Sequence, residues 1–477
     1  MQIFSFAFFC LTAAVFCLIF FGNKLLTKNS QKVHYTKWVL LLASYLFVCY
    51  ADYRFFLVLG ALTLIVWLCG KNLRYIKYGV LAAVLSLAFF KYTNFFAASF
   101  SRLLGEDDFT ALNIIMPLGV SFYTFSAISY LVDIHRGKLQ PMPLLDVALY
   151  LAFFPKLTSG PIQRGDTFFE QLNRPRSLGW NSFSEGIQIF CFGLFKKIVL
   201  ADRLSVLVNQ VYQTPLAFDA VTVWLAVLAY SLQIYFDFSG YSDMAIGAAK
   251  ILDIHMPRNF NLPYLAHNVT ELWKRWHISL SSWLQEYLYI SLGGNRKGKI
   301  RAYVNLFATM VIGGLWHGAS WTFIVWGALH GGALVVHKLW MLLTKSNEKH
   351  HNWLSNLLSI SVTFLFTSFC WIFFRAESVN KAFQILGRLF CFGDGVVHLY
   401  LWLFIALGGL LVGSIVAAIG AKDGVLPQNR QNQSLVDGYY PILNLSKFWP
   451  LVLFFVICGL IICLAYTGGS PFIYGAF

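Results

Sequence analysis

The chain has 477 residues, of which 58% are hydrophobic, 18% aromatic and only 12% charged, and its mean hydropathy is +0.63. A soluble fold cannot bury that much apolar surface, so this composition excludes an ordinary soluble protein. The formal charge of +15 would suggest nucleic-acid binding in a soluble chain, but here the basic residues lie in short loops between apolar runs. In that position they indicate membrane orientation, and no nucleic-acid partner is expected.

Long apolar runs predict an all-α, polytopic transmembrane protein with roughly ten to twelve spans, because about 20 apolar residues cross the hydrocarbon layer as a helix. The clearest runs are residues 3–21, 56–68, 303–336 and 451–466. Other runs are too short to cross alone, and we expect re-entrant or interfacial amphipathic helices around a central polar passage. No linker rich in Pro, Gly or Ser separates a soluble part, so residues 1–477 are expected to form a single membrane-embedded domain.

Charged clusters between the apolar runs indicate how the chain is oriented. The basic clusters at residues 24–37, 71–77 and 296–301 are expected on the cytoplasmic side, because Lys and Arg are enriched in cytoplasmic loops. The acidic cluster at residues 106–108 is expected to face outward. A polar stretch at residues 422–447 is predicted to be a surface loop. These features predict a multi-pass protein of the cell membrane, surrounded by the lipid bilayer.

His317 is the strongest candidate for chemistry. It lies in the sequence GGLWHGASW at residues 313–321, inside a longer stretch, residues 302–336, that contains no Lys, Arg, Asp or Glu. An ionisable residue at membrane depth is costly and is by default a functional hypothesis. The surrounding glycines allow a neighbouring backbone or a substrate to approach closely. A structural histidine that only hydrogen-bonds another helix is the alternative explanation.

His277 is the second candidate, in a segment at residues 271–284 that is typical of an amphipathic helix. At helical spacing His277 shares the apolar face with Trp273, Leu280 and Leu284, so we expect it to point inward. The alternative is an interfacial helix anchored by tryptophans, with an incidental histidine. An imidazole can take a proton from a hydroxyl near neutral pH, as acyl transfer to an alcohol requires.

Several strings around these histidines resemble motifs of bacterial membrane-bound O-acyltransferases, and in particular those of alginate O-acetyltransferases. They are PLGVSFYTF at residues 117–125, FPKLTSGPI at 154–162, FSGYSDMAIG at 238–247, LWKRWHISLS at 272–281, WHG at 316–318 and WIFFRA at 371–376. The resemblance covers roughly residues 116–376 by motif. The family pattern often has Phe where Leu272 stands and Arg where Lys274 stands, and these mild departures leave both histidines in place.

The resemblance implies that His317 corresponds to the family's essential histidine and His277 to its second polar position. It suggests that His317 is the general base for an incoming hydroxyl, while His277 orients or polarises a reactant. The acyl donor would be a thioester substrate such as acetyl-CoA or an acyl carrier. No permanently bound cofactor and no metal site are expected. Similar proteins act with an extracytoplasmic, serine-hydrolase-like acetyltransferase partner. The resemblance therefore implies that the acyl group, acetyl in this branch, would pass toward an exported polysaccharide as part of a relay.

Further polar and aromatic residues are assigned to a substrate-binding or inner shell around the two histidines: Trp316, Trp276, Arg275, His330 and Asp243. His330 shares one helical face with His337, which is expected to be structural. Asp243 and Asp237 are six residues apart and face different directions on a helix, so a structural role such as pairing with an arginine is expected.

The glycine-rich basic sequence GGNRKGK at residues 293–299 could hold the phosphates of the donor through backbone and basic groups. A cytoplasmic orientation loop explains the same residues. Two other functions stay open. One is D-alanyl transfer toward teichoic acid within the same superfamily, against which the WIFFRA string and the longer C-terminal region argue. The other is a secondary transporter or flippase, for which broken helices in two related halves would be expected, and no such repeat is visible.

Overall fold

The computed structural model describes residues 3–105, 110–176, 178–344, 352–393, 395–409, 442–468 and 473. Within these ranges the chain is helical, and the one β-type pairing is an isolated bridge between Phe218 and Val396. The prediction of an all-α fold is therefore confirmed for the described residues. The predicted outward loop at residues 106–108 and most of the predicted surface loop at residues 422–447 lie outside the described residues.

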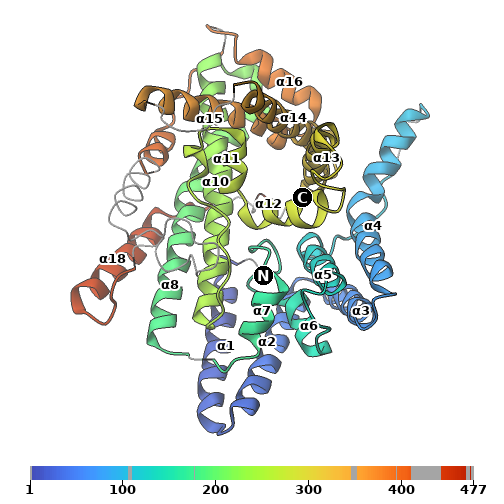
Figure 1. The fold of residues 1–477 in the computed structure, drawn as a ribbon. Coiled ribbons are helices and arrows are strands. Elements are labelled where there is room, and N and C mark those ends of the chain that lie inside the picture. Colours follow the sequence, from blue (N-terminus) through green and yellow to red (C-terminus); the bar gives the residue numbers. More distant parts are fainter. Residues whose placement is uncertain are drawn as a thin grey trace. The chain divides into compact units, whose positions relative to one another are not determined.

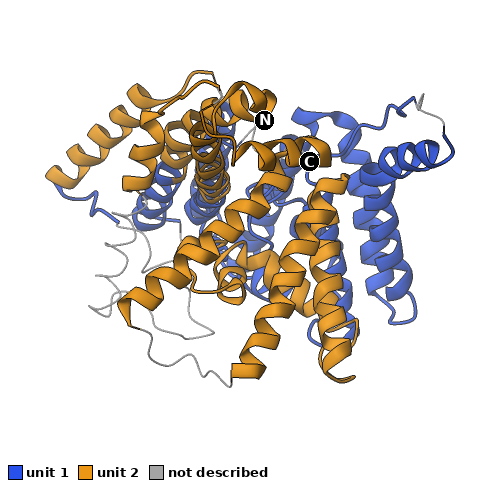
Figure 2. Cartoon of the chain, turned by 90° about the horizontal axis from the view of Figure 1, so that it is seen from above, with its two compact units in different colours: residues 1–192, 241–257, 442–447 blue, residues 193–240, 258–441, 448–477 orange. Residues whose placement is uncertain are grey.

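The helices divide into two compact units (Figure 2). Unit 1 comprises residues 1–192, 241–257 and 442–447, and unit 2 comprises residues 193–240, 258–441 and 448–477. The long helix α10 (Ala220–Ile251) begins in unit 2 and ends in unit 1. The expectation of a single membrane-embedded domain stays a prediction.

Unit 1 is built mainly from helices that pack against their neighbours in the chain (Figure 1). They are α1 (Phe6–Leu25), α2 (Asn29–Ala51), α3 (Tyr53–Gly70), α4 (Ile76–Leu103), α5 (Val120–His135), α6 (Leu144–Ala152), α7 (Gly165–Leu172) and most of α8 (Trp180–Leu194). Helix α6 packs on α2, where the buried Lys37 ammonium lies 2.7 Å from a carboxylate oxygen of Asp146. Pairing lets these two charges be buried together.

Unit 2 contains the remaining helices, several of them short and interrupted. They are η1 (Phe195–Ala201), α9 (Asp202–Gln213), η2 (Pro215–Ala217), η3 (Pro263–Leu265), α11 (Val269–Arg275), α12 (Ile278–Trp283), η4 (Leu284–Tyr289), α13 (Lys299–His317), α14 (Trp321–Thr344), α15 (Trp353–Arg375), α16 (Val379–Arg388) and α18 (Phe448–Leu464). Helix α14 lies between α13 and α15 and packs on both (Figure 1).

Among the described residues, helices α1, α3, α4, α10, α14 and α15 are long and apolar enough to cross a membrane. The chain is therefore a multi-pass membrane protein, as the hydropathy predicted, whereas the count of ten to twelve spans is not confirmed. The apolar run at residues 303–336 is not one helix, because α13 ends at His317 and α14 begins at Trp321.

The turn between α13 and α14 brings the two helices into close backbone contact. A Cβ atom on Gly314 would lie 2.3 Å from the carbonyl oxygen of Phe323, and one on Gly327 would lie 2.5 Å from that of Met310. Only glycine fits where backbones approach this closely. Gly314 of the GGLWHG string thus allows a neighbouring backbone to approach closely. The sequence suggested either this or the approach of a substrate.

A buried ion cluster joins η1, α9 and the part of α10 that belongs to unit 2. The Lys197 ammonium lies 2.8 Å from carboxylate oxygens of both Asp202 and Asp237, and all three side chains are almost fully buried. A structural pairing of Asp237 was expected from the sequence, but its partner is a lysine on η1 rather than an arginine. Such a pair holds elements in place because separating it would leave an uncompensated buried charge.

Candidate active site

His317 is the last residue of α13 and is only 4% exposed. Its imidazole packs edge-on against Trp326 of α14, with ring centroids 5.0 Å apart, and against Phe374 of α15, at 5.2 Å. Gly318 follows with extended backbone, and the amide of Ser320 donates to the Gly318 carbonyl to start the turn into α14. The ring is therefore held at a helix end by aromatic side chains of two neighbouring helices.

His277 lies where α11 ends and α12 begins, and it is fully buried. Its backbone is left-handed, with φ 42° and ψ 54°, a conformation that costs about 1 kcal/mol or more in a residue with a Cβ atom. The imidazole contacts Phe238 at a centroid distance of 4.6 Å and Trp316 at 6.4 Å. Strain of this kind persists only where the surroundings enforce it, and it is frequent at functional sites.

The prediction of one continuous amphipathic helix over residues 271–284 is wrong at this point. Helix α11 starts at an Asn268 cap, whose side chain accepts from the Glu271 amide, and it ends after Arg275. The amide of Ile278 then donates to the carbonyl of Asn259, and the Ser279 hydroxyl donates to the Asn259 side chain at 2.6 Å. These hydrogen bonds to Asn259 take the place of the bonds that a continuing helix would make. His277 is therefore buried at a helix break and not on the apolar face of one helix, as its spacing had indicated.

Trp316 links the two histidines, because its ring lies 5.0 Å from that of His317 and 6.4 Å from that of His277. Trp276 packs on Trp371 at 4.9 Å, and Trp371 stacks on Trp326 at 5.7 Å. We call the group Trp276, Trp316, Trp326, Trp371 and Phe374 the aromatic cage. The structure thus brings His317, His277, Trp316 and Trp276 together in unit 2, and their roles in a site stay predictions.

His330 belongs to the same neighbourhood. It lies on α14, 1% exposed, with its ring 4.9 Å from Trp326 and 5.3 Å from Trp273. Both ring nitrogens are buried without a hydrogen-bond partner among the described residues. His337, seven residues further along α14, hydrogen-bonds the Thr270 hydroxyl at 2.9 Å. His330 therefore lies on the side of Trp326 as a third histidine in contact with the cage.

Two residues that the sequence assigned to the inner shell, Arg275 and Asp243, do not contact the histidines through any contact described above. The guanidinium of Arg275 is about a quarter exposed, and it donates to the Glu271 carboxylate one turn earlier in α11 and to the Asn261 carbonyl. This i,i+4 pair supports α11 instead. Asp243 is buried in unit 1, whereas all three histidines belong to unit 2, and its part in the site stays a prediction.

Sequence reasoning did not assign the residues that surround the histidines most closely. Phe374 and Trp371 lie in the WIFFRA string, and Phe238 opens the FSGYSDMAIG string, so the signal was present without an assigned role. Trp326 has no such signal, because a tryptophan in an apolar helix is ordinary. Asn259 also escaped notice, since only the three-dimensional contact with Ser279 reveals it.

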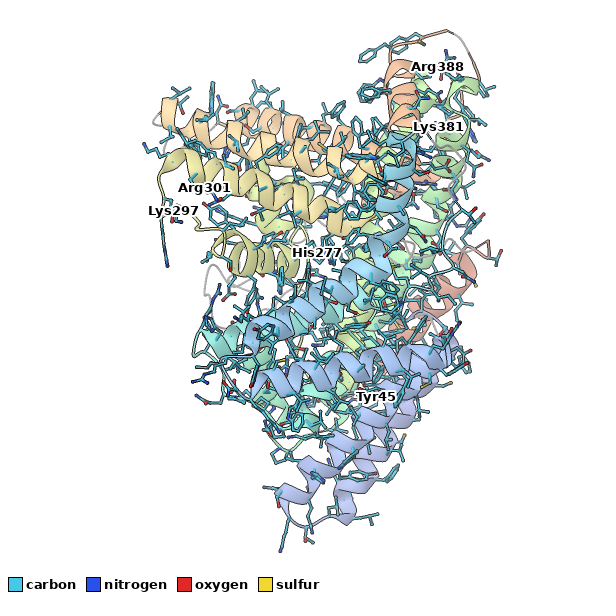
Figure 3. All side chains as sticks on the ribbon, turned by 90° about the vertical axis from the view of Figure 1, so that its right-hand side faces the viewer. Tyr45, His277, Lys297, Arg301, Lys381 and Arg388 are labelled. Atoms are coloured by element: carbon cyan, nitrogen blue, oxygen red, sulfur yellow. The ribbon has the colours of Figure 1, made fainter. Side chains whose placement is uncertain are left out.

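Charge at the site is low. Burial lowers the pKa of His277 to about 3, so its imidazole is neutral at pH 7 and offers one N–H donor and one lone-pair acceptor. A neutral, enclosed ring suits hydrogen bonding to a reactant better than it suits holding a proton. His277 is buried inside the fold, whereas the basic residues Lys297 and Arg301, near the start of α13, are exposed to the surroundings (Figure 3).

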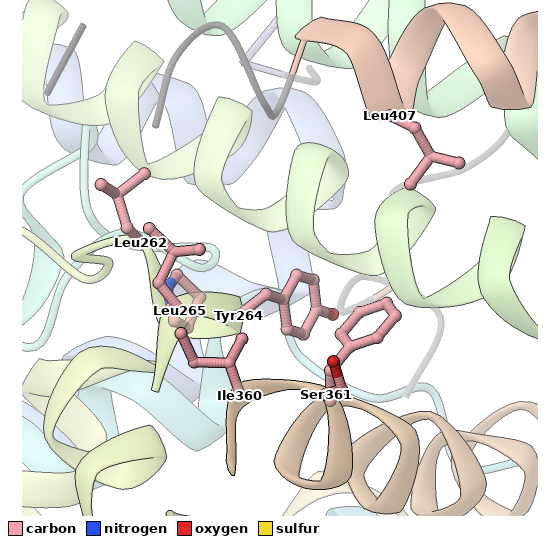
Figure 4. A pocket seen from close by; sticks show the side chains of 8 residues that line it. Leu262, Tyr264, Leu265, Ile360, Ser361 and Leu407 are labelled. Atoms are coloured by element: carbon pink, nitrogen blue, oxygen red, sulfur yellow. The ribbon is translucent and has the colours of Figure 1, made fainter. Parts of the chain in front are cut away.

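An apolar pocket of about 180 Å³ lies beside the cage (Figure 4). It is lined by the 262–265 segment, by Ile360, Ser361 and Phe364 of α15, and by Leu407. The ring of Tyr264 forms part of its wall and packs 5.9 Å from Trp276, and the Tyr264 hydroxyl donates to the carbonyl of Ser231. This lining suits a hydrocarbon group rather than a charged donor.

The sequence matches the family model of the membrane-bound O-acyltransferase family over residues 1–374. The chain belongs to this family, and it is accordingly an O-acyltransferase. Among curated proteins, it is 37% identical to the probable alginate O-acetylase AlgI of Pseudomonas syringae pv. tomato, over 84% of this chain and 79% of the relative.

Other relatives in the same family carry different names. The chain is 39% identical to the peptidoglycan O-acetyltransferase of Helicobacter pylori, over 67% of this chain and 66% of that protein. It is 27% identical to the teichoic acid D-alanyltransferase of Bacillus subtilis, over 56% of this chain and 70% of that protein. The relatives that match over the largest share of the chain are thus named for acetyl transfer.

Proposed function

We propose that this protein transfers an acetyl group from a cytoplasmic thioester donor toward hydroxyls of an exported polysaccharide, across the plasma membrane of a bacterium. The observation that carries this proposal is the convergence of His317 and His277 on the ring of Trp316, inside a buried aromatic cage of an O-acyltransferase. Relatives named for acetylation of alginate and of peptidoglycan support the acetyl group and the polysaccharide acceptor.

In the proposed reaction the acceptor hydroxyl gives its proton to His317 as its oxygen attacks the carbonyl carbon of the thioester. A carbon–oxygen bond forms, the carbon–sulfur bond breaks, and the proton leaves with the thiolate as a free thiol. The imidazole of His317 is suited to this task because it is enclosed by Trp326 and Phe374, which keep water from the reacting atoms.

His277 is proposed as a positioning residue. A ring that stays neutral at pH 7 donates a hydrogen bond to the thioester carbonyl or accepts one from the hydroxyl, without carrying the transferred proton. Its left-handed backbone fixes the ring next to Trp316. In this role the residue accelerates the reaction by orienting a reactant, so a different hydrogen-bonding side chain should replace it in part.

The donor and the partner belong to the same proposal. The sequence GGNRKGK at residues 293–299, exposed from Asn295 onward, is proposed to contact the phosphates of coenzyme A or of an acyl carrier on the cytoplasmic side. Its glycines 293, 294 and 298 have positive φ, and the Asn305 side chain donates to the Gly294 carbonyl, which gives the loop a defined shape. An extracytoplasmic acetyltransferase with a serine-hydrolase-like site is the proposed recipient of the acyl group.

The experiment replaces His317 with Ala in cells that depend on this chain, and it measures acyl ester on the exported polymer. We expect loss of ester by a factor of roughly 10² to 10⁴, since that is the contribution of a general base. The matched control is His337→Ala, a histidine on α14 that bonds Thr270 and should leave ester content near normal. The amount of each variant in the membrane fraction is measured in parallel.

Wild-type ester content in cells that contain only the His317→Ala protein would reject the proposed role of His317. Identification of the released group separates the two acyl reactions, because D-alanine instead of acetate would favour the teichoic acid alternative. A transporter predicts a different pattern again, in which substrate uptake changes while purified protein transfers no acyl group from a thioester to any hydroxyl.

A further inference from the structure

A groove of about 800 Å³ lies between α2, α3 and the start of α6, all in unit 1. Its volume is within the range of roughly 300 to 1,000 Å³ that is usual for small-molecule sites. The lining is apolar, and two of its few polar groups are bonded elsewhere, because the Trp38 indole donates to His34 and the Thr63 hydroxyl donates to the Leu59 carbonyl. Apart from the Tyr45 hydroxyl, the groove therefore offers an occupant hydrocarbon contact.

This groove is open to the surroundings of the protein. Leu42, Leu57 and Leu64 line it and are exposed, and α3 is one of the helices that are long and apolar enough to cross a membrane. Gly60 keeps the space free, because a Cβ atom there would meet nothing within 4 Å. In a membrane protein such a surface faces the bilayer, so a hydrocarbon chain of a lipid is the group that reaches it and suits it.

The two ends of the groove differ. Helices α2 and α3 are joined through Asp52 alone and pack on each other, so they run in opposite directions. Near this turn the ring of Tyr45 lies 5.2 Å from that of Phe56 (Figure 3). Trp38 and Leu64 line the other end, where the start of α2 and the end of α3 come together.

Basic residues gather at this second end, in the stretches 24–37 and 71–77, neither of which contains Asp or Glu. Lys71 follows Leu64 by seven residues, so the two differ by only about 20° around a helix. The Lys71 ammonium lies 3.4 Å from the ring centroid of Trp67. On α2, Nε2 of His34 accepts from the Trp38 indole at 2.9 Å, so the neutral imidazole carries its hydrogen on Nδ1 and can donate from there.

We propose that this groove binds one anionic phospholipid, whose acyl chain lies between α2 and α3 and whose phosphate is bound by Lys71 and His34. The ring of Trp67 holds the ammonium in place without neutralising its charge. An anionic headgroup is favoured because no carboxylate within the two basic stretches competes for these groups. The site makes no use of the histidines of unit 2, so it stands or falls independently of the proposed acyl transfer.

The test titrates the purified full-length protein in detergent with phosphatidylglycerol or phosphatidylcholine of identical chains, and it counts bound lipids by native mass spectrometry. We expect one phosphatidylglycerol per chain to bind about tenfold more tightly than phosphatidylcholine, because several basic residues near one headgroup favour negative charge. Raising the salt concentration should remove most of this preference, because the groups that bind the phosphate are exposed to solvent.

Two substitutions separate the contribution of the chain from that of the headgroup. Gly60→Leu fills the groove and should weaken both lipids alike, by about tenfold, since it displaces roughly two methylene groups of the chain. Lys71→Gln should weaken phosphatidylglycerol about fivefold and leave phosphatidylcholine unchanged. The matched controls are Gly332→Leu, at a helical glycine whose Cβ would also meet nothing within 4 Å, and Lys447→Gln, at an exposed lysine outside the two basic stretches. Both should bind as the wild type does.

Equal affinity of the wild type and Gly60→Leu would overturn the proposal, because the retained lipid would then lie elsewhere on the membrane-facing surface. Equal affinity of the wild type for the two lipids would overturn the anionic headgroup. A dimer without bound lipid that Gly60→Leu dissociates would instead make the groove an interface between copies of this chain. Should Gly60→Leu fail to fold, Lys71→Gln decides the matter. Lys71 is exposed, so its replacement leaves the fold intact, and an unchanged preference for phosphatidylglycerol in that variant excludes this site.

Discussion

The segments that carry His317 and His277 are held in different ways. His317 ends a regular helix, and its position depends on the close approach of α13 and α14 at Gly314 and Gly327. His277 lies in a left-handed break between two short helices, fixed by hydrogen bonds from residues 278 and 279 to Asn259. Both rings nevertheless contact Trp316.

This difference indicates which substitutions each segment tolerates. A position set by helix packing is sensitive to added volume, because two rigid backbones cannot move apart without losing many contacts. A position set by a strained backbone is sensitive to conformational preference and to the hydrogen bonds that enforce it. Added volume between α13 and α14 should therefore displace His317, whereas a change of backbone preference should displace His277.

The largest effect is expected for Gly314→Ala. The added methyl group would lie 2.3 Å from the Phe323 carbonyl oxygen, a backbone atom that cannot rotate away. Helices α13 and α14 must separate, so we expect destabilisation by about 3 kcal/mol or more and loss of acyl transfer. The matched control is Gly332→Ala on α14, where a Cβ atom meets nothing within 4 Å.

Thermal unfolding of the two purified variants provides the measurement. Gly332→Ala should be as stable as the wild type or slightly more stable, because Ala has the higher helix propensity by about 1 kcal/mol. If Gly314→Ala were equally stable and active, the close approach would not determine where His317 lies, and the packing explanation would fail.

Substitutions of His277 distinguish the contribution of its imidazole ring from that of its left-handed backbone. Asn adopts the left-handed conformation readily and retains hydrogen bonding, so His277→Asn should keep measurable acyl transfer. His277→Gly relieves the backbone but removes the ring, and we expect a stable, nearly inactive protein. His277→Leu adds an apolar side chain that disfavours φ 42°, so both stability and activity should fall, the latter by at least tenfold.

The rate of acyl transfer by purified, membrane-inserted variants is the quantity to compare. Normal turnover of His277→Leu would make His277 a bystander and reduce the site to His317. Equal inactivity of His277→Asn and His277→Leu would point to proton transfer rather than orientation.

A good part of this architecture was accessible from the sequence. Apolar runs are long and strongly periodic, so helices such as α1 and α3 were predicted at nearly their observed positions. The glycines around His317 predicted a weakened helix there, but not that the helix ends at His317, and the break at His277 was not predicted. The close backbone contact with α14 in one case and the hydrogen bonds to Asn259 in the other are tertiary contacts that the sequence does not reveal.

The candidate site, too, could be predicted from the sequence only in part. His317 could be found because an ionisable residue in a 35-residue stretch without other charge is unusual. Adjacency to Trp276 in sequence does not fix the direction of the Arg275 side chain, whose guanidinium pairs with Glu271, so its part in the site stays a prediction. His330, assigned to the inner shell from the sequence, lies next to Trp326 of the cage.

The lowered pKa of His277 predicts a pH dependence of stability. The folded pKa of about 3 lies below the usual value near 6.5, so the unfolded chain binds the proton first as pH falls. Stability from this group is complete above about pH 6.5 and is lost toward acid, by at most ~1.4 kcal/mol per pH unit. Wild type should therefore lose stability between pH 7 and 5 more steeply than His277→Asn. Parallel slopes for the two proteins would contradict the burial of a neutral ring.

The smallest effect is expected for Asn259, which holds the helix break at His277 through hydrogen bonds. Asn259 accepts from the Ser279 hydroxyl at 2.6 Å, while its main-chain carbonyl accepts from the Ile278 amide and would survive substitution. Asn259→Ala should therefore destabilise the protein by only about 1 to 2 kcal/mol and slow acyl transfer a few-fold, through a looser His277. Ser279→Ala removes the other half of the same bond. Both changes eliminate the bond from the Ser279 hydroxyl, and only Asn259→Ala also removes the longer bond from the Ser279 amide to the same oxygen at 3.4 Å. The combined effect should therefore be smaller than the sum of the single effects by about 1 kcal/mol. Additive losses in this double-mutant cycle would mean that Asn259 acts on the fold through other contacts, and that the left-handed turn at His277 is held by the main-chain bond alone.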